Sequence, residues 1–265
     1  MEDGRLRRVL KDKIGINLEA DKRYLLESRL KELMQSHRLE TFDQIAEKIE
    51  VENDASFLNQ VIDRITTRET RFFRDEHIFE SFARRIYKEH AINPNGGGGP
   101  VRIWSAGCSS GQEPCSIAIS LLEHLGSAMH PFLIDASDIS EEALKKARSG
   151  VYSSFELSRG VTDVIRDRYF EPAGDDFRVR EDILSRIHYT RVNFLNLLPG
   201  GPYDVIFFRN VAIYFEEETR RRIFEALYQS LRPGGVLILG STETAISYLE
   251  EMRIVEVNIA RFYIR

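Results

Sequence analysis

Apolar residues recur at helical spacing through the first third of the chain. In the segment 21–37, four apolar residues fall on one stripe of a helix, with charged residues around the rest of its circumference. These four are Leu26, Leu30, Leu33 and Met34. Segments 56–65 and 77–90 repeat the pattern. We therefore expect residues 1–92 to form an all-helical domain.

Four glycines between two prolines interrupt this pattern at residues 93–100, in the sequence NPNGGGGP. No helix or strand is expected to continue through such a run, so the segment is predicted to be a linker. Beyond it, short apolar runs alternate with amphipathic segments. The chain is thus expected to hold two domains, residues 1–92 and 101–265.

The second domain has the pattern of an α/β fold. The predicted strands are 101–107, 131–138, 203–210 and 236–240, and the predicted helices are 113–126, 140–150 and 216–235. Strands that alternate with helices indicate a parallel sheet with crossover helices. Residues 253–265 are expected to form two strands, one of them antiparallel because no helix separates them. Residues 151–186 contain a short helix and a hairpin at Gly174, and are expected to form a small inserted β-subdomain.

The composition is that of a globular protein. The chain has 265 residues, of which 42% are hydrophobic and 30% charged, which is too apolar for a disordered chain. It contains no run of about 18 apolar residues, so no membrane insertion is expected, and its start lacks the apolar core of a signal peptide. Cys108 and Cys115 have no partner Cys or His at metal-binding spacing. This argues against a metal site and favours a reducing compartment, so we expect a cytoplasmic protein.

The charge is distributed unevenly along the chain. A net charge of −5 argues against nucleic-acid binding by the protein as a whole. Residues 1–38 nevertheless hold ten Lys and Arg against seven Asp and Glu, and the stretch ITTRETRFFRDE adds Arg68, Arg71 and Arg74 at every third position. Two interpretations stay open for this basic end: a solvated helical surface, or a docking face for an acidic partner.

A glycine-rich turn, SAGCSSGQEP, follows the first predicted strand of the sheet, where ligands of parallel sheets bind. A dinucleotide site would need G-x-G-x-x-G, whereas Gly107 and Gly111 are spaced G-x-x-x-G. The same residues match the G-x-S-x-G of hydrolases, but that chemistry needs a late histidine, and the last one is His188.

S-adenosylmethionine (SAM) is the third possible ligand of this turn. It has no phosphate, so it requires small residues beneath its methionine end and an acid at the end of the second strand for the ribose. Asp138 lies nearer that strand end than Asp135, and is the preferred candidate. The alternative role for Asp138 is to cap the helix that starts near residue 140.

Five stretches of the chain resemble the CheR-type chemotaxis receptor glutamate O-methyltransferases, and they occur in that family's order. They are ITTRETRFFRD, RIWSAGCSSGQEPCSIA, DISEEALKKARSGVY, YDVIFFRNVAIYF and LRPGGVLILGSTE. The resemblance implies a Rossmann-like class I SAM-dependent methyltransferase domain under an N-terminal helical domain that docks receptors. It also implies methyl transfer from SAM to glutamates on the cytoplasmic helices of chemoreceptors, which gives glutamyl methyl esters and S-adenosylhomocysteine in chemotaxis adaptation.

The resemblance also assigns roles to individual residues. Arg74 and Tyr214 match the family's catalytic positions. Its cofactor-binding positions are matched by Arg68, Thr70, Arg74, Ala106, Gly107, Glu113, Asp138, Asn193, Phe194, Arg209 and Asn210. Glu113 is expected to bind the methionine amino group, Asp138 the ribose, and Asn193 with Phe194 the adenine. Phe72 and Phe73 are expected to pack inward between the domains.

Some positions depart from the family pattern. The family often has Asn at the position of Arg68, and RVNFLNLL offers a second register for the adenine contact at Asn196. The hairpin at Gly174 is shorter than in members that tether to a receptor's C-terminal peptide, so tethering is not expected. Two alternatives to receptor methylation stay open: methylation of a non-chemotaxis signalling protein, and a non-catalytic SAM-sensing module.

Overall fold

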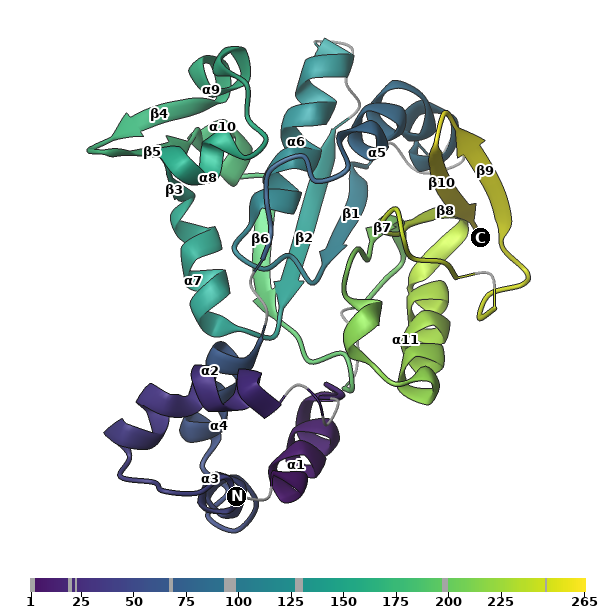
Figure 1. Ribbon diagram of the computed structural model, residues 1–265. Coiled ribbons are helices and arrows are strands. Elements are labelled where there is room, and N and C mark those ends of the chain that lie inside the picture. The colour runs from purple at the N-terminus through teal and green to yellow at the C-terminus, as the bar shows by residue number, and fades with distance from the viewer. Residues whose placement is uncertain are drawn as a thin grey trace.

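The computed structural model of the chain describes residues 3–18, 21, 23–66, 69–92, 99–126, 131–196, 200–245 and 247–265 (Figure 1). Most of the predicted linker, residues 93–98, lies outside the described residues. No helix within the described ranges has both the length and the apolar character to cross a membrane.

Four helices at the N-terminal end form a small bundle, here called the helical unit. They are α1 (Gly4–Ile14), α2 (Arg23–Ser36), α3 (Phe42–Glu50) and α4 (Ala55–Ile65). Thr41 caps α3 in a capping box with Gln44, and Asp54 caps α4 by accepting from the Phe57 amide. The apolar stripes of the helices bury one another, so the helical unit has its own hydrophobic core.

The rest of the chain is built on one seven-stranded sheet. Its strands, in spatial order, are β6 (Ile187–Arg191), β2 (Phe132–Asp138), β1 (Val101–Ala106), β7 (Tyr203–Phe207), β8 (Leu231–Ile238), β10 (Ala260–Ile264) and β9 (Arg253–Val257). The first five strands are parallel, and β10 runs antiparallel to both β8 and β9. The predicted α/β class and the antiparallel C-terminal strand are confirmed. Strand β6 was not predicted, because most of its residues are exposed and polar and give no apolar run.

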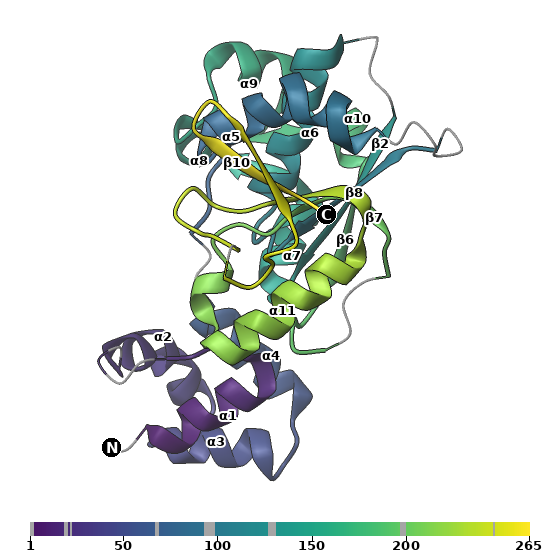
Figure 2. The same ribbon diagram turned by 90° about the vertical axis from the view of Figure 1, so that its right-hand side faces the viewer.

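Helices cover both faces of this sheet (Figure 2). One face packs against α5 (Glu76–Ser81), the π-helix η2 (Phe82–Ala91), α6 (Gln112–Leu125) and α7 (Glu141–Ser149), and the other against α11 (Glu217–Ser230). Neighbouring residues of β1 alternate between the faces: Ile103 belongs to the core under α6, and Trp104 to the core under α11. The segment predicted as one helix over 77–90 changes from α-helix to π-helix at Phe82. It packs on the sheet through Phe79 and Phe82, whose ring centres lie 6.1 and 5.1 Å from that of Phe207.

The inserted subdomain is present, as predicted, between α7 and β6. Its elements are β3 (Val151–Ser153), α8 (Ser154–Ser158), α9 (Asp163–Tyr169), β4 (Phe170–Ala173), β5 (Asp176–Val179) and α10 (Glu181–Leu184). The strands form an antiparallel sheet in the order β3-β5-β4. Phe72 is fully buried against this subdomain, with its ring 4.9 Å from Tyr152 and 5.5 Å from Phe170. Phe72 therefore packs inward, as expected, but its ring contacts are with the inserted subdomain.

The helical unit lies at the carboxyl ends of the parallel strands, below the sheet in Figure 1. The hydroxyl of Ser140, which caps α7, donates to Asp63 of α4 at 2.7 Å, and Arg191 at the end of β6 donates to Asn59 of α4 at 2.6 Å. On the other side, Ile16 after α1 forms a β-bridge with Phe215. The unit is thus held at both edges of the place where a parallel sheet binds its ligands.

Candidate active site

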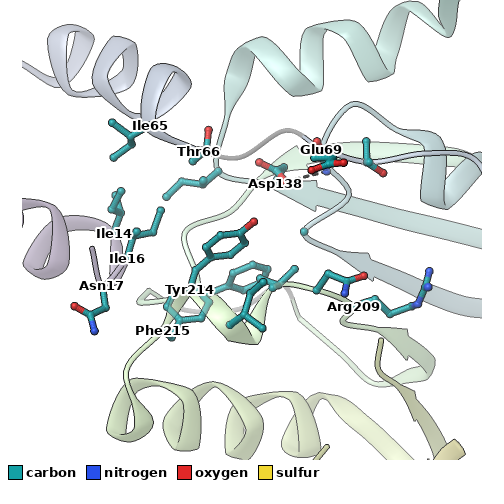
Figure 3. A pocket seen from close by; sticks show the side chains of 18 of the residues that line it. Ile14, Ile16, Asn17, Ile65, Thr66, Glu69, Asp138, Arg209, Tyr214 and Phe215 are labelled. Atoms are coloured by element: carbon teal, nitrogen blue, oxygen red, sulfur yellow. Dashed lines mark hydrogen bonds between the residues drawn. The ribbon is translucent and has the colours of Figure 1, made fainter. Parts of the chain in front are cut away.

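A cavity of about 520 Å³ lies between the helical unit and the carboxyl ends of the strands. Tyr214 extends into it, with Ile14, Ile16 and Ile65 of the helical unit on one side and Asp138 and Arg209 on the other (Figure 3). Ten of the predicted site residues line this cavity: Thr70, Arg74, Gly107, Glu113, Asp138, Asn193, Phe194, Arg209, Asn210 and Tyr214.

Of the two remaining predicted residues, only one is among those that the structure describes. Ala106 is fully buried at the end of β1, in the core under α11, and adds no side chain to the cavity. Arg68 lies outside the described residues.

The glycine-rich turn after β1 forms one wall of the cavity. The amides of Gly107 and Cys108 donate to the Ser137 carbonyl at 2.7 and 2.9 Å, which ties the turn to β2. Gly107 has φ +84°, and a Cβ there would lie 2.4 Å from Cγ2 of Val211. Only glycine fits both this backbone conformation and this close approach. The turn therefore brings the backbone of β1 against the loop that follows β7.

Asp138, at the end of β2, points at this turn. Its two carboxylate oxygens accept from the amides of Ser109 at 2.8 Å and Ser140 at 3.0 Å. Burial raises the pKa of Asp138 above its ordinary value, and these hydrogen bonds oppose that effect. The cap of α7 is Ser140 itself, whose hydroxyl accepts from the Ala143 amide. A carboxylate has about four acceptor sites, so Asp138 can still accept from a ligand hydroxyl.

Glu113 and Arg209 form a buried ion pair at the floor of the cavity. Glu113 is in the first turn of α6, and its oxygens accept from the Ser105 hydroxyl at 2.7 Å and from Arg209 at 3.1 Å. Burial raises the pKa of Glu113, with Arg209 as the main opposing influence. Arg209 is 2% exposed, and it also donates to Asp75 at 2.8 Å and to the carbonyl of Arg74 at 2.5 Å.

Arg74 lines the cavity, and its guanidinium has no hydrogen-bond or ion-pair partner among the residues that the structure describes. Three carboxylates share the cavity with it, and each is engaged elsewhere. Glu113 pairs with Arg209, Asp138 accepts from two amides, and Glu69 lies 3.5 Å from Arg159. The cavity thus carries a cation that none of its own acids neutralises.

Asn193 and Phe194 reach the cavity from the segment after β6. The Asn193 amide donates to the Lys13 carbonyl at the end of α1, at 2.7 Å, and its oxygen accepts from the Leu195 amide at 3.1 Å. Asn196 lies outside the cavity, in a separate surface hollow beside α11. Of the two possible registers, the one at Asn193 is therefore the one that reaches the cavity.

Asn210 and Tyr214 follow β7. Asn210 adopts φ +58°, and its amide donates to Glu243 at 2.6 Å, as does the amide of Gly240 at 3.0 Å. The Tyr214 carbonyl accepts from the Asn17 amide at 2.9 Å, while its hydroxyl has no partner within the described part of the chain. Asparagine is among the few residues other than glycine that tolerate left-handed backbone, so the residue type at position 210 suits this conformation.

Sequence reasoning missed part of this site. Asp75 and Glu243 hold residues that line the cavity. The cavity is also lined by Ser109, Ile139, Ile14, Ile16, Asn17 and Leu18. Ile139 could have been found, because it directly follows Asp138. The segment 14–18 carried no signal of its own, because its place depends on how the helical unit docks.

Comparison with known proteins gives matches over nearly the whole chain. The family model for the CheR methyltransferase SAM binding domain matches residues 68–260, and that for the CheR methyltransferase all-alpha domain matches residues 1–66. Chemotaxis protein methyltransferase Cher2 of Pseudomonas putida is 35% identical over 235 residues, which cover 86% of this chain and 85% of that protein. Chemotaxis protein methyltransferase 1 of Pseudomonas aeruginosa is 36% identical over 248 residues, covering 91% and 89%. The chemotaxis protein methyltransferase of Vibrio parahaemolyticus is 33% identical over 261 residues, covering 97% and 94%.

Proposed function

This chain belongs to the CheR methyltransferase family, and on that premise we propose that it methylates glutamate side chains on the cytoplasmic helices of chemoreceptors. It is a SAM-dependent methyltransferase of chemotaxis. The products are a glutamyl methyl ester and S-adenosylhomocysteine. The observation that carries the choice of acceptor is Arg74, a half-buried cation that pairs with none of the acids lining the cavity.

The polar groups of the cavity fit SAM. The Glu113 carboxylate suits the methionine ammonium, and the Asp138 carboxylate, with free acceptor sites, suits the ribose hydroxyls. The buried hydroxyl of Ser109 has no partner within the described residues and lines the cavity beside Asp138, so it can bond a ligand there. Ile139 and Phe194 provide apolar surface for a flat base. When bound, SAM supplies an electrophilic methyl group on a sulfonium.

The protein's main task is to position a nucleophile that needs no activation. A glutamate carboxylate has an ordinary pKa of about 4.3 and is ionised at neutral pH, so no general base is required. Arg74 can hold such a carboxylate through two parallel N–H donors. Correct placement of two reacting groups can account for about 7–11 kcal/mol of a barrier.

Two further features of the cavity favour the reaction. The Tyr214 hydroxyl extends into the cavity and has no other partner in the described residues, so it can donate to the acceptor or the cofactor (Figure 3). Ile14, Ile16 and Ile65 give one side of the cavity an apolar wall. Carboxylate and sulfonium neutralise each other during transfer, so exclusion of water favours the neutral products.

We further propose that the helical unit is the receptor-docking part of the protein. The division expected from the sequence, residues 1–92 and 101–265, stays a prediction. The packing of residues 76–91 on the sheet favours an earlier division, close to residue 66 where the two family models meet. Tethering to a receptor's C-terminal peptide is not expected, because only two residues separate β4 from β5.

The test is methyl transfer from labelled SAM to a cytoplasmic fragment of a chemoreceptor, read as methanol released by alkali. We expect alkali-labile label that disappears when the fragment's candidate glutamates are replaced by glutamine. Arg74→Ala should lower kcat by about 100-fold, as expected for a misplaced nucleophile. The matched control is Arg84→Ala, an exposed arginine on η2 that is paired with Glu80 and remote from the cavity.

Two results would redirect the proposal. If the fragment takes up no label while calorimetry shows that the same sample binds S-adenosylhomocysteine, the acceptor is another protein or the chain is a non-catalytic SAM sensor. If Arg74→Ala turns over normally, the acceptor carboxylate is held by another group.

A further inference from the structure

One buried arginine joins three parts of the active site. Arg209, which follows β7, donates to Glu113 in α6, to Asp75 before α5, and to the carbonyl of Arg74. Its side chain is 2% exposed, and its guanidinium carbon lies 5.0 Å from the centre of the Phe79 ring. Asp75 is 24% exposed and does not line the cavity, so it is placed to act on the site through Arg209 and not on a ligand.

The backbone around Arg74 is unusual. Phe73 has φ +50° and Asp75 has φ +59°, so left-handed residues stand on both sides of Arg74. Aspartate tolerates this conformation better than most residues, but for the bulky Phe73 it is an outlier that persists only where the surroundings enforce it. The enforcing contacts are visible here: the Phe73 amide donates to the Ser116 hydroxyl at 2.9 Å, and Asp75 is held by Arg209 and by Ser241.

These contacts have a consequence for charge. Arg74 is next to Asp75 in sequence and shares the cavity with Glu113, and either acid would be a natural ion-pair partner for it. Both are instead held by Arg209. The Arg74 backbone is fixed through its carbonyl, and its guanidinium is left without an internal partner in the described chain.

We propose that Asp75 is a positioning residue for methyl transfer: through Arg209 it fixes the backbone of Arg74 and keeps the Arg74 guanidinium available for the acceptor carboxylate. This role rests on the proposed function of Arg74. Burial favours a raised pKa for Asp75, but Arg209 and Ser241 outweigh it and hold the pKa below its ordinary value. Asp75 is therefore ionised throughout the pH range of an activity assay.

Two substitutions at Asp75 distinguish the role of its carboxylate from the role of its backbone conformation. Asp75→Gly removes the carboxylate and tolerates φ +59°, so it does not add strain. Asp75→Asn keeps an acceptor for Arg209 and also tolerates this conformation, so it should restore part of the function. Glu76→Gln is the matched control, because it removes a charge one residue further on, from an exposed side chain outside the cavity.

We expect Asp75→Gly to lower kcat by about 100-fold, the effect of a displacement of about 1 Å in a reacting group. Asp75→Asn should lie between Asp75→Gly and wild type, and Glu76→Gln should match wild type. The affinity for S-adenosylhomocysteine should stay within about threefold in all three variants, because Glu113 keeps Arg209 and Ser105 as partners.

The decisive readout is a double-mutant cycle with Arg74→Ala. If Asp75 acts through Arg74, then Asp75→Gly should change kcat by less than about threefold once Arg74 is absent, because the two residues act as a unit. An equal loss in both backgrounds would overturn the proposal and assign Asp75 a structural role. Loss of S-adenosylhomocysteine binding in Asp75→Gly would also overturn it.

The proposal can fail separately from the proposed function. If the wild-type protein methylates no receptor fragment, the crystal structure of Asp75→Gly with S-adenosylhomocysteine tests the inference without an acceptor. Displacement of the Arg74 carbonyl from Arg209 would support it. An unchanged contact of 2.5 Å would overturn it.

Discussion

Replacing Arg209 with methionine would test whether one buried cation holds the active site together. The Arg209 side chain is 2% exposed, and its guanidinium donates to Glu113 at 3.1 Å and to Asp75 at 2.8 Å. Methionine fills much of the same space without charge, so Arg209→Met leaves both carboxylates without their cation. Breaking a buried ion pair from one side costs about 3–5 kcal/mol. We expect a loss of about 4 kcal/mol in the free energy of unfolding, out of a typical total of about 5–15 kcal/mol.

The loss should depend on pH, with a defined sign. Burial raises the pKa of Glu113 from its ordinary 4.5, and removal of Arg209 raises it further. A carboxyl group whose pKa is higher in the folded state holds its proton more tightly there. Its contribution to stability is complete below the unfolded pKa and is lost as the pH rises through the folded pKa. Arg209→Met should therefore be most destabilised near pH 8 and should recover part of its stability as the pH is lowered toward 5.

The assay is urea unfolding followed by far-UV circular dichroism at several pH values. The control is Arg84→Met, which removes an exposed pair with Glu80 at 2.8 Å and should change stability by no more than about 1 kcal/mol. If the free energy of unfolding of Arg209→Met at pH 8 lies within about 1 kcal/mol of the wild-type value, the ion network does not hold the site together. A deficit that does not change with pH would show that lost packing, and not unpaired carboxylates, causes the instability.

Three further predictions follow from the cavity. Gly107→Ala should lower the free energy of unfolding in urea by about 2–4 kcal/mol, because φ is +84° and the new Cβ would lie 2.4 Å from Val211. Adding Val211→Ala to this variant should restore the part of the stability that the clash removes. No recovery in the double variant would contradict the clash. Tyr214→Phe should leave stability unchanged and lower kcat about three- to tenfold, the worth of one hydrogen bond; unchanged kcat would remove the hydroxyl from the mechanism. Calorimetric affinity for S-adenosylhomocysteine should fall as the pH drops toward the raised pKa of Glu113, because a protonated carboxyl cannot pair with the ammonium. An affinity that stays flat until the pH is below the ordinary pKa of a glutamate, about 4.3, would contradict this role.

The sequence predicted the parts of the site that depend on strand ends. Asp138 ends one strand, and Glu113 comes seven residues after the end of another, and the apolar runs of both strands are plain in the sequence. Parallel neighbouring strands bring their carboxyl ends to one edge, so the two acids had to lie at the same cavity. The role of Gly107 could also be predicted from its place at a strand end, since it begins a turn that needs a residue without a side chain.

The sequence could not predict contacts between distant segments. Asp75 is adjacent to Arg74 in the chain, yet its partner is Arg209, 134 residues further on. The left-handed backbone at Phe73 leaves no trace in residue type, because bulky residues rarely adopt it, and Asp75 is of a type that tolerates this conformation without requiring it. The docking of Ile14 and Ile16 onto the cavity depends on how the helical unit sits on the sheet, which local periodicity does not specify.

The difference between Arg71 and Arg74 shows what the buried network achieves. Both line the cavity and neither has a partner in the described residues, but Arg71 is exposed to solvent, while Arg74 is half-buried. Water satisfies an exposed guanidinium, whereas partial burial of an unpaired cation costs free energy. The fold accepts that cost at Arg74 by holding Asp75 and Glu113 on Arg209. The cost is recovered when an anion arrives, so we expect an acceptor carboxylate to bind more favourably at Arg74 than at Arg71, and we expect the charge on the acceptor to contribute directly to its placement.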